Sequence, residues 1–186
     1  MASTTALYRY RGVVADTVVA SKLRGASAVW PALGVRLAEQ LPRHARTVDA
    51  VTAVPTEPRR RKHRGFDHAW LFARGVAAQL HIPAVATLEA RRGARDQGAI
   101  ASIDERQQLP PGTFEASRSL AGARLLLVDD VLTTGATFTA AVSALAEAGA
   151  TAVHLAALAR AGAHPLDGRG HRGDDHESGP SHRVPR

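Results

Sequence analysis

Two adjacent carboxylates, Asp129 and Asp130, directly follow a short aliphatic run at 125–128. Threonine hydroxyls and Gly135 come next, and residues 140–148 have the length and apolar character of a helix that ends at a glycine. A strand that enters a helix through such a turn presents free backbone N–H groups at the positive end of the helix dipole, where phosphate binds. Carboxylates repel a phosphate at contact range, so their expected partners are sugar hydroxyls or a metal ion beside it. The segment therefore predicts a site for a phosphorylated sugar.

The elements that must position these residues alternate along the chain. Four segments resemble short strands, and two further segments have helical spacing, the second with Asp67 as its expected N-cap. The strands are expected at 48–54, 83–88, 125–128 and 152–159, and the helices at 29–41 and 67–80. Strands separated by helices predict an α/β fold with a mainly parallel sheet flanked by helices. Ligands in such sheets bind at the carboxyl ends of the strands, where Asp129 is expected to lie.

The composition narrows the range of partners. The formal charge of +7 is carried by 22 Arg and 2 Lys, and the charges of residues 161–186 balance, so the excess lies on the body of the chain. Such a charge favours nucleic acid or a phosphorylated small molecule. Cysteine is absent, and neither a secretory leader nor a bilayer-long apolar stretch is visible, which favours the cytoplasm and no membrane. Residues 161–186, rich in Gly, His, Pro and charge, are predicted to form a disordered polar tail.

A dense group of cations follows the 48–54 strand, because residues 59–64 read Arg-Arg-Arg-Lys-His-Arg. At the same sheet edge as Asp129 these side chains could clamp a pyrophosphate, since Arg makes bidentate contacts to phosphate oxygens. A solvated basic loop or a nucleic-acid contact explains the charge equally well.

The segment 125–137 resembles the phosphoribosyl-diphosphate (PRPP) binding loop of the type I phosphoribosyltransferases, and all of its positions fit that pattern. Further motifs across residues 7–160 are similar to the ComF family, a phosphoribosyltransferase-like group associated in some bacteria with competence for DNA uptake. The matching residues are Tyr10-Arg-Gly12, Lys22-Leu-Arg-Gly25, Ala53-Val54-Pro55, Arg64-Gly-Phe66, Gln97, Arg106 and Phe114.

The resemblance implies a single Rossmann-like type I phosphoribosyltransferase domain over residues 7–160, with a small hood above the site. Asp129 and Asp130 are then the catalytic pair, which accepts hydrogen bonds from the ribose 2′- and 3′-hydroxyls and could also touch Mg²⁺, the expected cofactor. The residues after the pair are expected to hold the 5′-phosphate. They are Val131, Leu132, Thr133, Thr134, Gly135, Ala136 and Thr137.

The resemblance also assigns the rest of the site. Pro55 and Thr56 belong to a pyrophosphate loop, with Arg60 and Arg64 as its basic clamp. Gln97 and Arg106 are expected in the hood.

Three features depart from the family pattern. Asp67 and His68 stand where the family usually has Asn and Gln, and an ionised carboxylate only accepts hydrogen bonds where an amide also donates. Leu109 stands where the family usually has Asn. The four-cysteine zinc ribbon at the start of many members is missing.

The sequence thus predicts a ComF-like phosphoribosyltransferase, a glycosyltransferase that binds PRPP with Mg²⁺ and releases pyrophosphate on transfer to an unidentified acceptor. A non-enzymatic PRPP or nucleotide sensor, and a competence factor that binds nucleic acid through the 59–64 surface, are the alternatives. Nucleic acid is the less favoured partner, because only eight aromatic residues occur and no nucleic-acid motif is present. The sequence leaves open whether the chain forms a homodimer.

Overall fold

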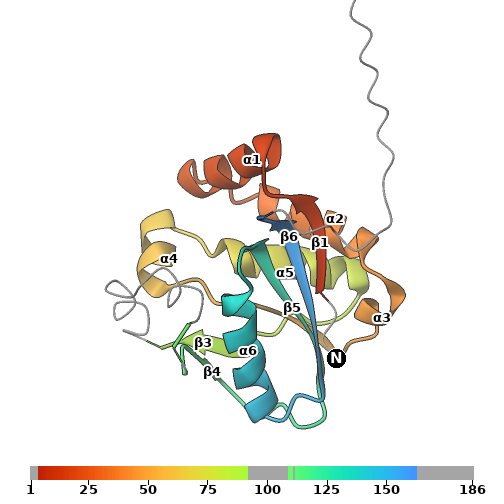
Figure 1. Cartoon of the computed structure of the whole chain (residues 1–186). Helices are drawn as coiled ribbons and strands as arrows, with labels where there is room; N and C mark the ends of the chain where they lie inside the picture. Colours follow the sequence, from red (N-terminus) through yellow and green to blue (C-terminus); the bar gives the residue numbers. More distant parts are fainter. Residues whose placement is uncertain (1–3, 92–108, 111, 163–186) are drawn as a thin grey trace, which may run out of the picture.

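The computed structural model describes residues 4–91, 109–110 and 112–162. Gln97, Arg106 and the predicted tail at 163–186 lie outside these residues. No helix in the described ranges is long and apolar enough to cross a membrane. In chain order (Figure 1) the elements are β1 (Thr4–Arg9), α1 (Gly12–Leu23), α2 (Val29–Gln40), α3 (Arg43–Arg46), β2 (Ala50–Ala53), α4 (Pro58–Arg64), α5 (His68–Leu80), β3 (Leu88–Ala90), β4 (Phe114–Ala116), β5 (Arg124–Leu132), α6 (Ala136–Glu147) and β6 (Ala152–Arg160).

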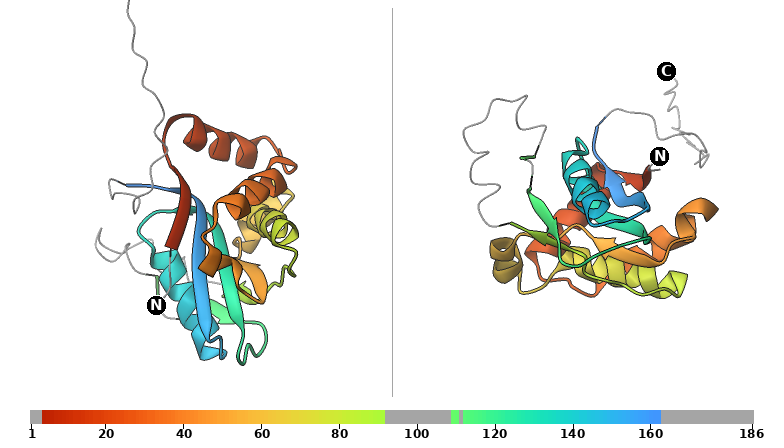
Figure 2. Two further views of the ribbon diagram at one scale, coloured as in Figure 1. Left: turned by 90° about the vertical axis from the view of Figure 1, so that its right-hand side faces the viewer. Right: turned by 90° about the horizontal axis from the view of Figure 1, so that it is seen from below.

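The main sheet has four strands in the order β1-β6-β5-β2, and all neighbouring pairs are parallel. Helices α2 and α5 pack on one face of this sheet and α6 on the other, as the two turned views show (Figure 2). The chain therefore has the predicted α/β fold with a mainly parallel sheet flanked by helices. A parallel sheet brings the carboxyl ends of its strands to one edge, which is where the site forms.

One predicted strand needs correction, and one strand was missed. Residues 83–88 do not form a strand of the main sheet: Ala84 makes a single parallel bridge with Val51, and the chain then turns away. At residue 87 the amide donates to the hydroxyl of Thr52, at 3.4 Å. Leu88–Ala90 instead pairs antiparallel with Phe114–Ala116 in a separate two-stranded sheet. Strand β1, which the sequence reasoning missed, extends the main sheet beside β6.

The core consists of two apolar clusters, one on each face of the main sheet. Leu126 and Val128 of β5 face Trp30 of α2 and Phe72 of α5, and all four side chains are buried. Leu127, from the opposite face of β5, packs in the cluster that includes Phe138 and Leu145 of α6. This alternation along β5 agrees with the period of two in a strand and explains why both faces are covered by helices.

Helices α2 and α5 approach each other at two glycines. A Cβ atom on Gly75 would overlap the carbonyl oxygen of Pro31, and one on Gly34 would overlap that of Phe72. Glycine at both positions lets the backbones of the two helices touch. The close contact fixes α5, whose first residues border the site.

Candidate functional site

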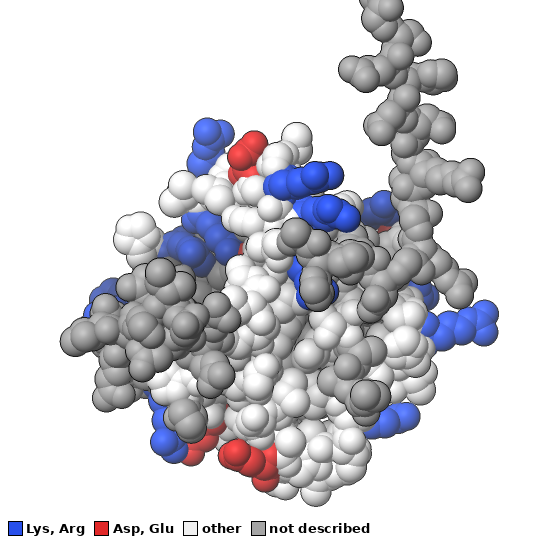
Figure 3. Space-filling view, viewed as in Figure 1, with Lys and Arg blue, Asp and Glu red and all other residues white. Residues whose placement is uncertain are grey.

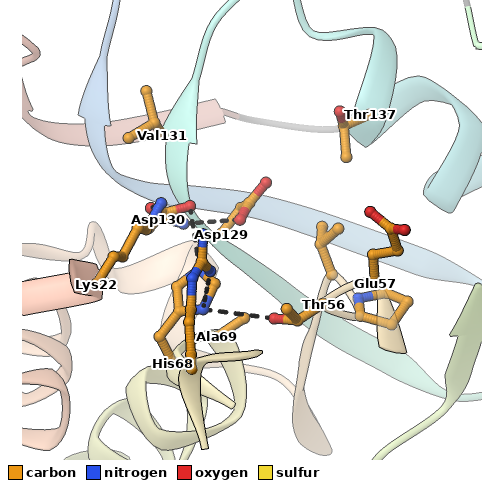
Figure 4. Close-up of a pocket in the computed structure, with 12 residues that line it drawn as sticks. Lys22, Thr56, Glu57, His68, Ala69, Asp129, Asp130, Val131 and Thr137 are labelled. Atoms are coloured by element: carbon orange, nitrogen blue, oxygen red, sulfur yellow. Dashed lines mark hydrogen bonds and ion pairs between the residues drawn. The ribbon is translucent and has the colours of Figure 1, made fainter. Parts of the chain in front are cut away.

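The site forms where β2 and β5, adjacent parallel strands, reach the same edge of the sheet. Ala53 pairs with Val128, and the amide of Val54 donates to the carbonyl of Val128 at 3.0 Å. The pairing sets the loop after β2 directly beside Asp129. A pocket of about 190 Å³ lies there, lined by Lys22, Val54, Pro55, Thr56, Glu57, Arg64, His68, Ala69, Asp129, Asp130, Val131 and Thr137 (Figure 4).

Asp129 and Asp130 lie within β5, which continues to Leu132. The expectation that the strand ends at residue 128 was wrong, because Val131 and Leu132 pack against the two core clusters and so extend the strand. The acidic pair is thereby held by ladder pairing, with Asp129 in register with Ala157 of β6. A strand gives the carboxylates a more rigid base than a loop would.

Asp130 is buried, with 6% of its surface exposed, and it faces Lys22 and His68. The ammonium of Lys22, from the last turn of α1, forms an ion pair with its carboxylate, and His68 Nε2 lies 3.8 Å from Oδ1. Burial alone would raise the pKa of Asp130, but His68 and the charge of Lys22 outweigh it and hold the pKa well below its usual range. Asp130 is therefore ionised at neutral pH.

His68 is a buried histidine, and its contacts select one tautomer of the neutral ring. Arg64 Nη1 lies 3.1 Å from His68 Nδ1, and a guanidinium has only donors, so Nδ1 must accept. The proton of the neutral ring then resides on Nε2, the atom that faces Asp130. The ring also packs edge-on against Trp30, with the ring centroids 5.0 Å apart. The arrangement links Arg64 to Asp130 through one imidazole.

Asp129 differs from its neighbour in environment. Its side chain is half-buried, and its Oδ1 accepts a hydrogen bond from the amide of Asp130 at 2.8 Å. Loss of solvent around the carboxyl, followed by the negative charge of Asp130, raises the pKa of Asp129 well above its ordinary value. In Figure 4 its carboxyl group points away from Lys22 and into the open part of the pocket. Asp129 is the carboxyl of the pair that a ligand can reach.

Asp67 joins the loop after β2 to the start of α5. Its carboxylate accepts from the amide of Trp70 at 3.1 Å, as expected of an N-cap, and from the hydroxyl of Thr56 at 2.9 Å. The predicted cap is confirmed. The second bond was not predicted, and it holds the Pro55–Thr56 loop against α5.

The opposite wall comes from the start of α6. Gly135 adopts a positive φ of 86°, a conformation that side chains disfavour, and the helix begins at the next residue. The first turn of a helix leaves amide N–H groups without intrahelical partners. Thr137, in this turn, lines the pocket. The site thus combines a carboxyl group, a helix N-terminus and the cationic side chain of Arg64.

The structure brings together seven of the residues that the sequence singled out. Pro55, Thr56, Arg64, Asp129, Asp130, Val131 and Thr137 all line the pocket.

The remaining predicted site residues either do not line the pocket or lie outside the described residues. Leu132 is buried in the core, and neither the turn at 133–135 nor Ala136 at the start of α6 lines the pocket. Arg60 is in α4, but its side chain, like Gln97 and Arg106, is outside the described part of the structure.

Lys22 and His68 are the site residues that sequence reasoning undervalued. Lys22 entered only as one of the residues that match the ComF family, and His68 only as a departure from the family pattern. Their partner, Asp130, is far away in sequence, so neither contact has a local signal. The usable hint was the match of Lys22 to a family lysine.

Comparison with known proteins assigns the family. The model of the phosphoribosyl transferase domain matches residues 67–175, which is more than half of the chain. The chain therefore belongs to the phosphoribosyltransferase domain family. A comparison with curated protein sequences found no match.

The chain is also similar in fold to solved structures. Over 70% of the chain, the fold is similar to the glutamine PRPP amidotransferase from B. subtilis complexed with ADP and GMP, with 29% identity and a TM-score of 0.51. A structure described as the allosteric regulatory enzyme of purine biosynthesis gives 28% identity and a TM-score of 0.51, again over 70% of the chain. The chain covers 26% and 25% of these two proteins, about a quarter of their length. A purine phosphoribosyltransferase from Pyrococcus horikoshii Ot3 gives 21% identity and a TM-score of 0.45, with 69% of this chain and 71% of that chain covered.

Proposed function

We propose that the chain is a ComF-like phosphoribosyltransferase that binds PRPP in the pocket between β2, β5 and α6. The observation that carries the proposal is the position of Asp129, which shares one pocket with the Pro55–Thr56 loop and with Thr137 at the start of α6. A ligand with vicinal hydroxyls flanked by phosphate and diphosphate fits these three groups. Membership of the phosphoribosyltransferase domain family supports this choice.

Each wall of the pocket suits one part of PRPP. Asp129 accepts from a ribose hydroxyl, and the N-terminus of α6 with Thr137 binds the 5′-phosphate. Asp130, which is buried and paired with Lys22, adds negative charge behind Asp129. Departure of pyrophosphate leaves positive charge on the sugar, which the nearby carboxylates stabilise, and Arg64 neutralises the leaving group.

Mg²⁺ fits this pocket only together with its ligand. Among the described residues no group of three or more His, Cys, Asp or Glu side chains can hold a metal ion. Mg²⁺ commonly binds through one or two carboxylates, several waters and the phosphates of a substrate. Asp129 is the carboxylate within reach, since Asp130 is engaged by Lys22. The ion would neutralise the diphosphate of the bound ligand.

The test is direct binding of PRPP by calorimetry in the presence of Mg²⁺. Asp129→Asn should weaken binding by about tenfold to a hundredfold, since a bond to a charged group contributes about 1.5–3 kcal/mol. Asp16→Asn, an exposed aspartate on α1, is the matched control and should bind as the unmodified protein does. Equal PRPP affinity in folded Asp129→Asn protein would refute the assignment.

Transfer itself is tested by pyrophosphate release with a panel of acceptors. We expect slow turnover with the common purines and pyrimidines, because Asp67 and His68 replace the family's two amides and Leu109 its Asn. Brisk release with an ordinary nucleobase would contradict this. PRPP binding without release for any acceptor would favour a sensor.

A further inference from the structure

A second, larger pocket adjoins the first. It has a volume of about 620 Å³, within the range typical of small-molecule sites, whereas the pocket at Asp129 is smaller. It lies where the end of α1 faces the basic helix α4, and it is lined by Lys22, Leu23, Gly25, Arg59, His63 and Arg64. Lys22 and Arg64 border both pockets, so one ligand, or two that react together, can extend from one into the other.

The side chains that line this second pocket carry only positive charge. Its lining includes two arginines, a lysine and a histidine, and no carboxylate. In the described part of the chain neither Arg59 nor His63 forms an ion pair. Figure 3 shows Lys and Arg side chains gathered between α1 and α4 on this face. Because Asp130 already neutralises Lys22, the charge available to a ligand comes from the α4 side, chiefly from Arg59 and Arg64.

One wall of the pocket is apolar and uncovered. Leu23, the last residue of α1, is 77% exposed, a high value for a large apolar side chain. An apolar wall opposite guanidinium groups suits a flat ring that carries a negative group. A free inorganic anion has no apolar surface that could pack against Leu23.

We propose that this pocket binds the acceptor and that the acceptor is an acidic ring compound, held by Arg59 and His63 through its carboxylate or phosphate. The inference rests on the proposed function and names the substrate class for it. The bordering residues Lys22 and Arg64 set the ring beside the sugar bound at Asp129. Neutral nucleobases leave Arg59 without a partner and bind weakly.

The experiment compares ligands that differ only in charge. Nicotinate and nicotinamide, and orotate and its amide, serve as probes in binding measurements with and without PRPP. The acid of each pair should bind about tenfold tighter than its amide, as expected for a charge-assisted contact. Arg59→Gln with His63→Gln should abolish this preference and leave PRPP affinity unchanged. Arg61→Gln with Lys62→Gln, on the same helix but outside the pocket, removes at least as much positive charge and should preserve the preference.

Several results would overturn the inference. Equal binding of acid and amide by the unmodified protein excludes an anionic acceptor at this place. A tenfold loss of PRPP affinity in the Arg59, His63 variant means that the pocket holds the diphosphate instead. Loss of acid preference in the Arg61, Lys62 variant as well means that general charge, as in nucleic-acid binding, explains it. The preference is measurable without PRPP, so a protein that fails to bind PRPP would refute the proposed function separately.

Discussion

Arg64 Nη1 donates a hydrogen bond to His68 Nδ1, 3.1 Å away, and this contact determines how His68 meets Asp130. We predict that the neutral ring carries its proton on Nε2. Long-range ¹H–¹⁵N correlation spectra at about pH 8, above the ordinary pKa of imidazole, should show Nε2 protonated and Nδ1 bare. Arg64→Met should remove the tautomer preference. A protonated Nδ1 in the unmodified protein would show that the Arg64 contact is misassigned.

The ion pair of Lys22 and Asp130 predicts a loss of stability on substitution. Lys22→Met leaves the buried Asp130 carboxylate without its cation. Breaking a fully buried pair costs about 3–5 kcal/mol. Because the Lys22 side chain is 21% exposed, a smaller cost of about 2 kcal/mol is expected from the usual penalty for an unsatisfied buried charge. Urea unfolding measures it, and Lys62→Met, at the exposed second lysine, should change stability by less than about 0.5 kcal/mol. Equal stability of the two variants would contradict the pair.

We predict that replacing Gly75 by alanine lowers the stability of the protein, which is the opposite of the usual effect of this substitution in a helix. On an exposed helix, Gly→Ala stabilises by about 1 kcal/mol. In α5 the added Cβ would overlap the carbonyl oxygen of Pro31, a backbone atom that cannot rotate away. Gly75→Ala should therefore destabilise the protein by about 2 kcal/mol. Thermal unfolding decides the sign, with exposed Gln79→Ala on the same helix as the control. A raised melting temperature would disprove the close approach of α2 and α5.

Asp49 predicts a pH-dependent contribution to stability. Its carboxylate accepts from the guanidinium of Arg124 at 2.8 Å and from the Arg124 amide at 2.8 Å, and these bonds lower the pKa of Asp49 in the folded protein. A lowered pKa stabilises the fold above the unfolded pKa of about 3.9, and the contribution disappears as pH falls through the folded value. Asp49→Asn should thus melt lower than the parent at neutral pH but not in acid. A difference that stays constant with pH would exclude the carboxylate as its origin.

The sequence predicted the placement of the acidic pair and the α5 cap because both depend on local signals. Asp129 follows an aliphatic run, and Asp67 precedes a helical period. The extent of β5 could not be predicted in this way, since acids are depleted in strands and seemed to end it. Burial of Leu132 against α6 overrides that propensity, which is a tertiary effect.

The contacts of Asp130 could not be predicted from the residues next to it in the sequence. Nothing in the residues around Lys22 indicates that α1 places its last turn against β5, and nothing around His68 indicates its tautomer. Both depend on packing between elements that are distant in sequence. Composition described the charge of residues 59–64 correctly but could not tell which side chains face a pocket and which face solvent.

The ladder between β2 and β5 has an evolutionary consequence. Backbone bonds, such as that from Val54 to Val128, fix the distance between the Pro55–Thr56 loop and Asp129 independently of surface side chains. The second pocket is built instead from side chains on α1 and α4. If the proposed function holds, mutations on these helices can therefore change which acceptor is recognised while the strands preserve the sugar-binding half. The same architecture offers protein engineers three positions to vary, Leu23, Arg59 and His63, that lie on the helices and not on the strands that carry Asp129.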